Sequence, residues 1–241
     1  APADSALKAL AEAGSDWDGH ASVDSTGYRL VRAWRLAVHA RIADGLTAPA
    51  RATLGEAFAM PDLSQLEGVV WPLLQQRPAH LLPRRYGCEV IAKAEPAACT
   101  EASGWAALLE DAAREVRDEL GGRGPLSERS WGERNTTKIC HPLAGALPGP
   151  VAARLCMPAE ALPGDGSMPR VQGPAFGASQ RMVVAPGHEA DGIIHMPGGQ
   201  SGHPLSPFWG AGHDDWAQGR PSGFLPGPSH HELTLVPATR Q

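Results

Sequence analysis

Glycine and proline are distributed unevenly along this chain of 241 residues, and this distribution limits its fold more than any other feature. Residues 1–141 contain 12 Gly and 8 Pro, whereas residues 142–241 contain 16 Gly and 15 Pro. A turn-forming residue at roughly every third position leaves no room for long helices. We therefore expect a helical first part, followed by a part with short strands and long loops.

Two helices are predicted near the N-terminus. The first covers residues 3–13, with Gly14 in the C-cap position. Asp24 or Ser25 can cap the second, and Gly45 is expected to end it. Apolar residues recur on the second helix at helical spacing: Val31, Trp34, Val38 and Ile42. Its arginines are expected mostly on other faces: Arg29, Arg32, Arg35 and Arg41.

Two further helices complete the predicted helical part. A helix is expected over residues 62–76, although Pro72 would kink or divide it. The strongest helical pattern runs over residues 103–120 and stops at Gly121 and Gly122. Its predicted buried stripe is Trp105, Leu108, Leu109, Ala112, Val116 and Leu120.

Short segments with strand composition follow at 181–185, 192–196 and 233–236. Three short strands cannot close a barrel, so they resemble the edge of a larger sheet system. The predicted class is α+β, with a mainly helical segment at 1–124 and a Gly/Pro-rich segment of strands and loops at 125–241. We do not expect these segments to be independent domains.

Charge and the length of apolar stretches argue against two classes of partner, nucleic acids and membranes. The chain has 21 basic and 26 acidic residues, a net charge of −5 and no Lys/Arg run, which is unlike a nucleic-acid-binding protein. No apolar stretch in the sequence is long enough to cross a bilayer.

Residues 1–4 have neither an initiator Met nor a signal-peptide pattern, so we expect a processed or excised product.

The four cysteines form two close pairs in the sequence, Cys88 with Cys99 and Cys140 with Cys156. The Cys-x-x-Cys spacing of zinc sites is absent. Each pair has the separation of a short disulfide-closed loop, and two disulfides would imply an oxidising compartment such as the periplasm. The alternative is four reduced, buried cysteines in a cytoplasmic protein.

Residues 199–203 (Gly-Gln-Ser-Gly-His) are similar to a nucleophile elbow, which would make Ser201 a nucleophile. The pattern Gly-x-Ser-x-Gly requires glycine where His203 stands, and Pro204 prevents a helix from starting directly behind the serine. A tight turn is the better interpretation.

Seven of the ten histidines lie after residue 140, and His203, His213 and Asp214 could in principle share a metal ion. No fixed ligand spacing supports that site, so histidines bonded to backbone carbonyls are expected instead. The seven are His141, His188, His195, His203, His213, His230 and His231.

Asp214 and Asp215 lie near Trp209 and Trp216 in the sequence, a pattern that resembles a carboxylate pair with an aromatic sugar platform. The two carboxylates of a glycosidase rarely sit next to each other in sequence. Adjacent acidic residues of this kind are usually solvated or cap a helix, so no catalytic pair is assigned.

An ordered series of motifs carries more information than any single one of them. Trp-Gly-Glu-Arg-Asn ends at Asn135, and Pro-Gly-Asp-Gly follows at 163–166. Gly-Ala-Ser-Gln-Arg begins at Gly177, Met-Pro-Gly-Gly-Gln-Ser-Gly-His-Pro covers 196–204, and Trp-Ala-Gln-Gly begins at Trp216. In this order they resemble the C-terminal part of the β chain in the penicillin acylase family of N-terminal nucleophile hydrolases.

The resemblance implies an αββα sandwich, assembled from an α chain and a β chain in the bacterial periplasm. It implies hydrolysis of the amide bond of β-lactam antibiotics or N-acyl homoserine lactones, with roles in antibiotic resistance or quorum quenching. The nucleophile of such enzymes is an N-terminal serine released by autocatalytic processing. The periplasmic location favours the disulfides Cys88–Cys99 and Cys140–Cys156.

This sequence departs from the family at its first residue, which is Ala1 and not serine. The family's nucleophile, oxyanion-hole and calcium-binding residues lie upstream of the region that the chain resembles, so no catalytic, metal-binding or cofactor residue is assigned. We expect a non-catalytic C-terminal piece held to the α chain and to a Ser-led piece of the β chain, with a higher oligomer also compatible. The alternative is a secreted binding or scaffold module derived from the same fold.

Overall fold

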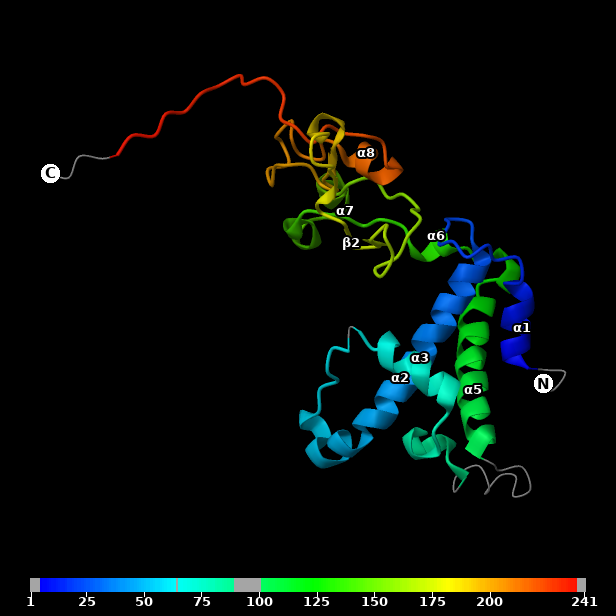
Figure 1. Ribbon diagram of the computed structural model, residues 1–241. Coiled ribbons are helices and arrows are strands. Elements are labelled where there is room, and N and C mark those ends of the chain that lie inside the picture. The colour runs from blue at the N-terminus through cyan, green and yellow to red at the C-terminus, as the bar shows by residue number, and fades with distance from the viewer. Residues whose placement is uncertain (1–4, 64, 89–100, 238–241) are drawn as a thin grey trace. The chain divides into compact units, whose positions relative to one another are not determined.

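The structure is a computed structural model that describes residues 5–63, 65–88 and 101–237 (Figure 1). The side chains of residues 101 and 102 are not described. The chain forms two compact units, unit 1 (Ala1–Arg134) and unit 2 (Asn135–Gln241). Each unit is treated separately below.

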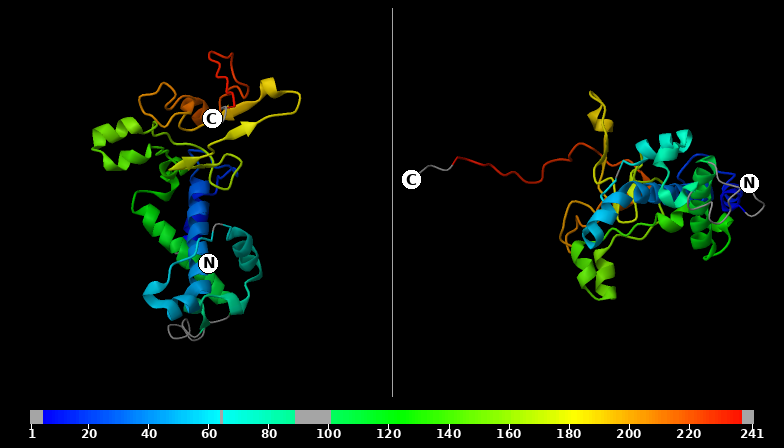
Figure 2. Two further views of the ribbon diagram at one scale, coloured as in Figure 1. Left: turned by 90° about the vertical axis from the view of Figure 1, so that its left-hand side faces the viewer. Right: turned by 90° about the horizontal axis from the view of Figure 1, so that it is seen from below.

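Unit 1 is helical, and its two long helices pack along each other (Figures 1 and 2). The α-helices are α1 (Ala6–Ala13), α2 (Thr26–Leu54), α3 (Glu67–Gln76), α5 (Glu101–Gly121) and α6 (Trp131–Arg134). Short 3-10 turns lie at Gly55–Ala57, Ala79–Leu81, Arg84–Tyr86 and Leu126–Glu128. Helices α1 and α2 both contact α5, which is therefore the central element of the unit.

The core of unit 1 is centred on the apolar face of α5. All six side chains of the predicted stripe, from Trp105 to Leu120, are buried, and they pack against Leu10, Leu30 and Val38 of α1 and α2. Burial of a large apolar side chain contributes roughly 1.5–3 kcal/mol. The prediction for this helix is confirmed because its 3.6-residue period is unbroken over more than four turns.

Helix α2 differs from the prediction because it continues through Gly45 and Pro49 and ends at Leu54. A Cβ atom at Gly45 would lie 2.6 Å from the ring of Pro83, so this glycine allows a close contact instead of ending the helix. Gly55, with φ of 53°, occupies the C-cap. At the other end, Ser25 accepts a hydrogen bond from the N–H of Tyr28, as expected of a capping residue.

Two of the arginines on α2 were predicted on the wrong face. Arg29 and Arg41 are only 7% and 8% exposed. Arg41 follows Val38 by three positions and precedes Ile42, so helical spacing places it on the buried stripe. Burial lowers the pKa of Arg29, and the nearby charge of Arg134 acts in the same direction.

The remaining helix prediction, for residues 62–76, is confirmed with a later start at Glu67. Pro72 lies inside α3 without ending it. Proline has no backbone N–H, so the helix loses one hydrogen bond, the one from residue 72 to the carbonyl of Gly68 in the first turn. The helix ends at Arg77, which adopts a left-handed conformation with φ of 48°.

The compact units divide at 134/135, whereas the sequence changes character at 124/125. Residues just before the division belong to unit 1 by their contacts. The N–H of Trp131 donates to the carbonyl of Ser25 at 3.1 Å, and that of Gly132 donates to Val23 at 2.7 Å. The rings of Tyr28 and Trp131 pack edge to face at 4.8 Å.

Unit 2 consists of loops with short helices and two two-stranded antiparallel sheets. The strands β1 (Gln172–Gly173) and β2 (Phe176–Gly177) form one sheet, and β3 (Arg181–Val183) and β4 (Ile193–His195) form the other (Figure 2). The α-helices are α7 (Gly149–Ala152) and α8 (His213–Gln218), with 3-10 turns at Pro142–Ala146, Ala153–Leu155 and Glu189–Asp191.

The strand predictions have mixed outcomes. The segments at 181–185 and 192–196 contain β3 and β4, with Arg181 opposite His195 and Val183 opposite Ile193. The predicted strand at 233–236 is wrong, because these residues are exposed and pair with no other described strand. The mixture of long helices and short strands confirms the α+β class. None of the described helices is both long and apolar enough to cross a membrane.

Candidate functional site

The motifs of unit 2 meet around Trp216, whose side chain is fully buried. Its Nε1 donates to the carbonyl of Ala178 at 3.2 Å, and Leu162 and Ala217 pack in the same cluster. A Cβ atom at Gly177 would lie 2.0 Å from Cζ2 of Trp216. The Gly-Ala-Ser segment that begins at Gly177 therefore encloses the indole ring, and only glycine fits its first position.

Two arginines bind the C-terminal end of α8. Arg181 Nη1 donates to the carbonyl of Trp216 at 2.8 Å, and its guanidinium lies 5.5 Å from the centre of the indole ring. Arg170 donates to the carbonyl of Ala217. Positive charge is favourable at a helix C-terminus, where carbonyl groups lack intrahelical partners. Burial lowers the pKa of both arginines.

Two histidines connect α8 and the segment after it to other parts of unit 2 through hydrogen bonds to backbone carbonyls. His213 Nδ1 donates to the carbonyl of Pro197 at 2.5 Å, and His195 Nε2 donates to the carbonyl of Arg220 at 2.6 Å. A carbonyl oxygen only accepts, so each of these nitrogens carries a proton. Both side chains are buried, and their observed role is the predicted one of bonding backbone carbonyls.

Residues 198–210 form a closed turn. Gly199 has φ of 73°, and a Cβ atom there would lie 2.2 Å from the carbonyl oxygen of Phe208. The N–H of Gln200 donates to that same carbonyl at 3.2 Å, and the N–H of Gly210 donates to Gly198 at 3.0 Å. These contacts agree with the interpretation of this segment as a tight turn.

Ser201 lies in this turn, and no described residue bonds to its hydroxyl as the general base of a serine nucleophile would. Its Oγ accepts the backbone N–H of His203 at 3.1 Å. The imidazole of His203 accepts the N–H of Leu205 through Nδ1 at 3.2 Å. Among the described residues, no imidazole nitrogen is hydrogen-bonded to Ser201 Oγ.

Asp214 and Asp215 lie in the first turn of α8, where negative charge is favourable. Asp215 accepts a hydrogen bond from Nε of Arg220 at 2.9 Å. Trp209 is half-buried and packs against His141, with ring centres 5.6 Å apart, and Trp216 is inaccessible. The described residues contain no group of three or more His, Cys, Asp or Glu that could hold a metal ion.

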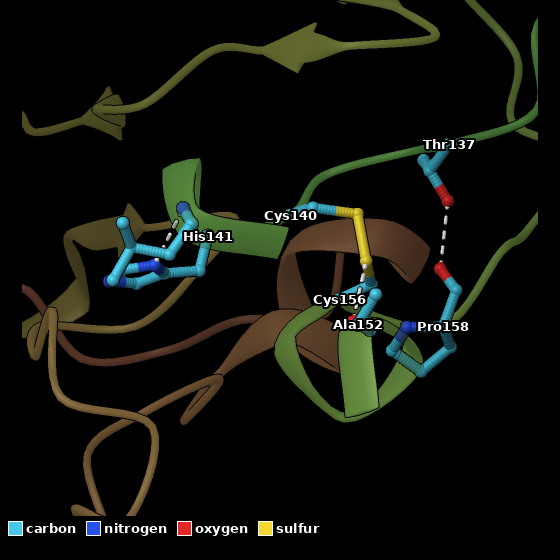
Figure 3. The surroundings of a disulfide bond; sticks show 7 residues. Thr137, Cys140, His141, Ala152, Cys156 and Pro158 are labelled. Carbon is cyan, nitrogen blue, oxygen red and sulfur yellow. Dashed lines mark hydrogen bonds between the residues drawn. A yellow bond between two sulfur atoms is a disulfide. The ribbon is translucent and has the colours of Figure 1, made fainter. Parts of the chain in front are cut away.

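A disulfide closes one end of a short antiparallel arrangement that the sequence did not predict (Figure 3). Cys140 and Cys156 are bonded, and residues 135–141 run alongside 155–162. The hydroxyl of Thr137 donates to the carbonyl of Pro158 at 2.9 Å and accepts the N–H of Glu160 at the same distance. The predicted Cys140–Cys156 disulfide is confirmed. Cys99 lies outside the described residues, so the Cys88–Cys99 pair stays a prediction.

Asn135 fixes the other end of this arrangement. Its buried side-chain amide donates to the carbonyls of Leu162 and Gly164, at 2.7 and 3.0 Å. The N–H of Leu162 donates back to the carbonyl of Asn135 at 3.0 Å. The Asn of one motif is thus bonded to the beginning of the next, Pro-Gly-Asp-Gly at 163–166.

Comparison with known proteins gives the same family as the motifs. Residues 2–225 match the family model described as Penicillin amidase. The chain belongs to the penicillin amidase family. No curated protein matches the sequence. The family is one of hydrolases, so the motif residues around Trp216 belong to a hydrolase fold, and in this chain they form its packing and backbone contacts.

Unit 1 of this penicillin amidase family chain contains an ionic network that sequence reasoning missed. The buried guanidinium of Arg41 donates to Asp111 at 2.9 Å and to Glu115 at 2.7 Å, and the Tyr86 hydroxyl also donates to Asp111. Burial alone would lower the pKa of Arg41, but the hydrogen bonds to Glu115 and Asp111 outweigh it, and the pKa is raised. The sequence did contain one signal for this network, because Arg41 falls on the apolar stripe of its helix and a buried arginine needs acidic partners.

Glu110 on α5 caps the N-terminus of α1. Its carboxylate accepts the Ser5 hydroxyl at 2.7 Å and the backbone N–H groups of Ala6 and Leu7 at 2.5 and 3.3 Å. Burial would raise the pKa of Glu110, but these hydrogen bonds dominate and lower it. The cap joins residues that are more than 100 positions apart in sequence.

A cavity of about 750 Å³ opens on unit 1 beside α2. Its apolar wall is formed by Leu36, Met60 and Leu63, which are all exposed. An ion pair between Arg51 and Asp44, at 2.6 Å, lies in the same lining. Unit 1 thus presents a concave surface that combines apolar and charged side chains.

Proposed function

We propose that this chain is the C-terminal, non-catalytic portion of the β chain of an acylase, built into an αββα sandwich. The acylase hydrolyses the amide bond of N-acylated substrates, with an N-terminal serine on another chain as its nucleophile. Membership of the penicillin amidase family supports the hydrolase class. The same family membership supports partner chains, namely the α chain and the Ser-led part of the β chain.

The surface of unit 2 is the observation that carries this proposal. The apolar cluster at its centre consists of Leu162, Trp216 and Ala217. A much larger set of apolar side chains is exposed: Leu143, Leu147, Val151, Phe176, Met182, Val183, Leu205, Phe208 and Leu225. We infer that these side chains contact other protein chains in the native particle. An isolated two-stranded sheet has marginal stability, so the two sheets of unit 2 also favour pairing with further strands from other chains.

The proposed chemistry takes place outside the residues described above. The N-terminal serine hydroxyl attacks the acyl carbon, its own α-amino group takes the proton, and the amine leaves as the acyl-enzyme forms. Water then hydrolyses the acyl-enzyme, and hydrogen-bond donors stabilise the oxyanion in both steps. The substrates are β-lactam antibiotics, N-acyl homoserine lactones or both. This chain contributes the packing that supports the catalytic part.

The proposed location is the periplasm or the exterior of the cell. The Cys140–Cys156 disulfide supports it, because such bonds persist in oxidising compartments. Peptide mapping of the native protein without reductant tests this. We expect peptides linked through Cys140 and Cys156, and free thiols at both positions would contradict the location.

An activity comparison tests the proposed function. The native particle that contains this chain, and the purified chain alone, are each incubated with a penicillin and with N-acyl homoserine lactones of different acyl length. We expect amide hydrolysis by the particle and none by the chain alone. Turnover by the chain alone would overturn the proposal. A native particle without activity, consisting of this chain as a monomer, would instead indicate a secreted scaffold module.

A further inference from the structure

Arg170 and Arg181 are two partly buried cations of unit 2 that lack a counter-charge. Among the residues that the structure describes, neither guanidinium forms an ion pair with a carboxylate. Asp215, in the helix that both arginines contact, is bonded to Arg220 at 2.9 Å instead. Arginine is rarely buried in proteins unless it is paired, so this arrangement needs a physical explanation.

The hydrogen bonding of these two side chains is also incomplete. A guanidinium carries several N–H donors. Within the described part of the chain, Arg181 donates one bond to the carbonyl of Trp216, and Arg170 donates one to the carbonyl of Ala217. Nε of Arg170 and both Nε and Nη2 of Arg181 are buried and have no partner there. A buried donor without a partner costs free energy, so these groups favour a further acceptor.

The two positive charges lie close together. They bind the carbonyls of consecutive residues, Trp216 and Ala217, at the C-terminal end of α8. The charge of Arg170 lowers the pKa of Arg181, in the same direction as burial. Because a negative charge between the two groups would be attracted by both of them, an anion is favoured over neutral water as the further acceptor.

Arg41 in unit 1 provides a comparison within the same chain. Its guanidinium donates to the carboxylates of Asp111 and Glu115, and these bonds raise its pKa in spite of burial. The pKa of Arg170 and the pKa of Arg181 are both lowered by burial. The chain therefore supplies carboxylates to the buried arginine of unit 1, whereas its described residues supply none to the pair in unit 2.

We propose that Arg170 and Arg181 bind a small oxyanion, a carboxylate or a phosphate, between their guanidinium groups. Each guanidinium is a planar fork of N–H donors, which matches two oxygen atoms of such an anion. Neither side chain is fully buried, so an ion can reach the pair from solvent. The bound anion would link β3, which begins at Arg181, to the segment before β1 and to the end of α8. This inference does not depend on the proposed function.

Titration of the purified chain with inorganic phosphate, followed by calorimetry at constant ionic strength, tests the proposal. We expect saturable binding with a Kd of about 1 mM or tighter. Arg170→Gln and Arg181→Gln should each bind at least about tenfold more weakly, because each removes charge-assisted hydrogen bonds. The matched control is Arg154→Gln, which removes the same charge from an exposed arginine of unit 2 and should leave the Kd unchanged.

Two results of this titration would overturn the proposal. One is the absence of saturable binding by a chain whose circular dichroism shows it to be folded. The other is an equal Kd in Arg154→Gln and in the two glutamine variants at the site, which would place the anion elsewhere on the surface.

Lysine variants keep the test decisive where a glutamine variant does not fold. Arg170→Lys and Arg181→Lys preserve the positive charge but lose the paired donors. We expect folded lysine variants to bind phosphate about threefold to tenfold more weakly than the unsubstituted chain. An unchanged Kd in both would overturn the proposal.

The native particle distinguishes the source of the anion. Phosphate binding by the particle with the Kd of the purified chain supports a free anion as the ligand. Binding by the purified chain alone would mean that a carboxylate of another chain occupies the pair, and it would overturn the assignment to a free anion. A particle that binds phosphate but contains only this chain would overturn the proposed function and leave the anion site standing.

Discussion

The hydroxyl oxygen of Ser201 accepts a hydrogen bond from the backbone N–H of His203 at 3.1 Å. The imidazole of His203 accepts the N–H of Leu205 and so takes part in the same turn. Both side chains stabilise local backbone geometry, which is the usual role of Ser and other short polar residues in turns. A motif that is similar to a nucleophile elbow in sequence is therefore a structural turn.

Substitution Ser201→Ala is expected to leave the kcat and KM of the complete acylase unchanged. It removes one exposed hydrogen bond within a turn, so the cost in stability is about 1 kcal/mol or less. Hydrolysis kinetics of the variant particle check this. Loss of turnover with normal assembly would make Ser201 a catalytic residue and contradict our interpretation.

Substitution Gly177→Ala is expected to displace Trp216 and to destabilise unit 2 by about 1–3 kcal/mol. The added Cβ would meet Cζ2 of the buried indole at 2.0 Å. Thermal unfolding followed by tryptophan fluorescence measures the effect. Gly202→Ala is the matched control, because nothing lies within 4 Å of a Cβ at that position. Equal stability of the two variants would show that Trp216 does not pack as described.

Substitution Arg41→Met is expected to destabilise unit 1 by about 2 kcal/mol, since it removes two charge-assisted hydrogen bonds. Asp111 and Glu115 are 39% and 54% exposed, so water can solvate them and the loss stays below that of a fully buried pair. The control is Arg114→Met, which removes an exposed contact of 3.8 Å to the same Asp111. Urea unfolding should show a larger decrease in the free energy of unfolding for Arg41→Met than for Arg114→Met. An equal decrease in both variants would contradict the network around Arg41.

The Glu110 cap is expected to make unit 1 less stable in acid. The folded-state pKa of Glu110 lies below its ordinary value of 4.5, so its contribution is present above that pH and is lost as the pH falls through the folded pKa. Glu110→Gln cannot ionise, and the difference in unfolding free energy from the unsubstituted chain should be about 1 kcal/mol at pH 7. Urea unfolding at descending pH should show this difference shrinking below about pH 4.5. A difference that grows in acid would contradict the cap.

The strongly periodic parts of the fold could be predicted from the sequence. Helix α5 keeps apolar residues at helical spacing from Trp105 to Leu120, so one physical signal determined its type, its limits and its buried face. Gly45 failed as a stop signal because its effect depends on Pro83, which is distant in sequence. The strand at 233–236 failed because strand composition does not ensure a pairing partner, and these residues pair with no described strand.

The site could be predicted in part. The order of the motifs gave the family, but it did not show that Arg170, Arg181, His195 and His213 hold α8 in place. Such bonds to backbone carbonyls depend on chain segments that come together only on folding. The arrangement of residues 135–141 beside 155–162 was missed for a related reason, because neither segment alternates apolar and polar residues.

The composition of the native particle tests the central claim most directly. Every chain in the active particle is identified by intact mass and N-terminal sequencing. Our account predicts this chain together with an α chain and a separate chain that begins with serine. An active particle that contains only copies of this chain would contradict it.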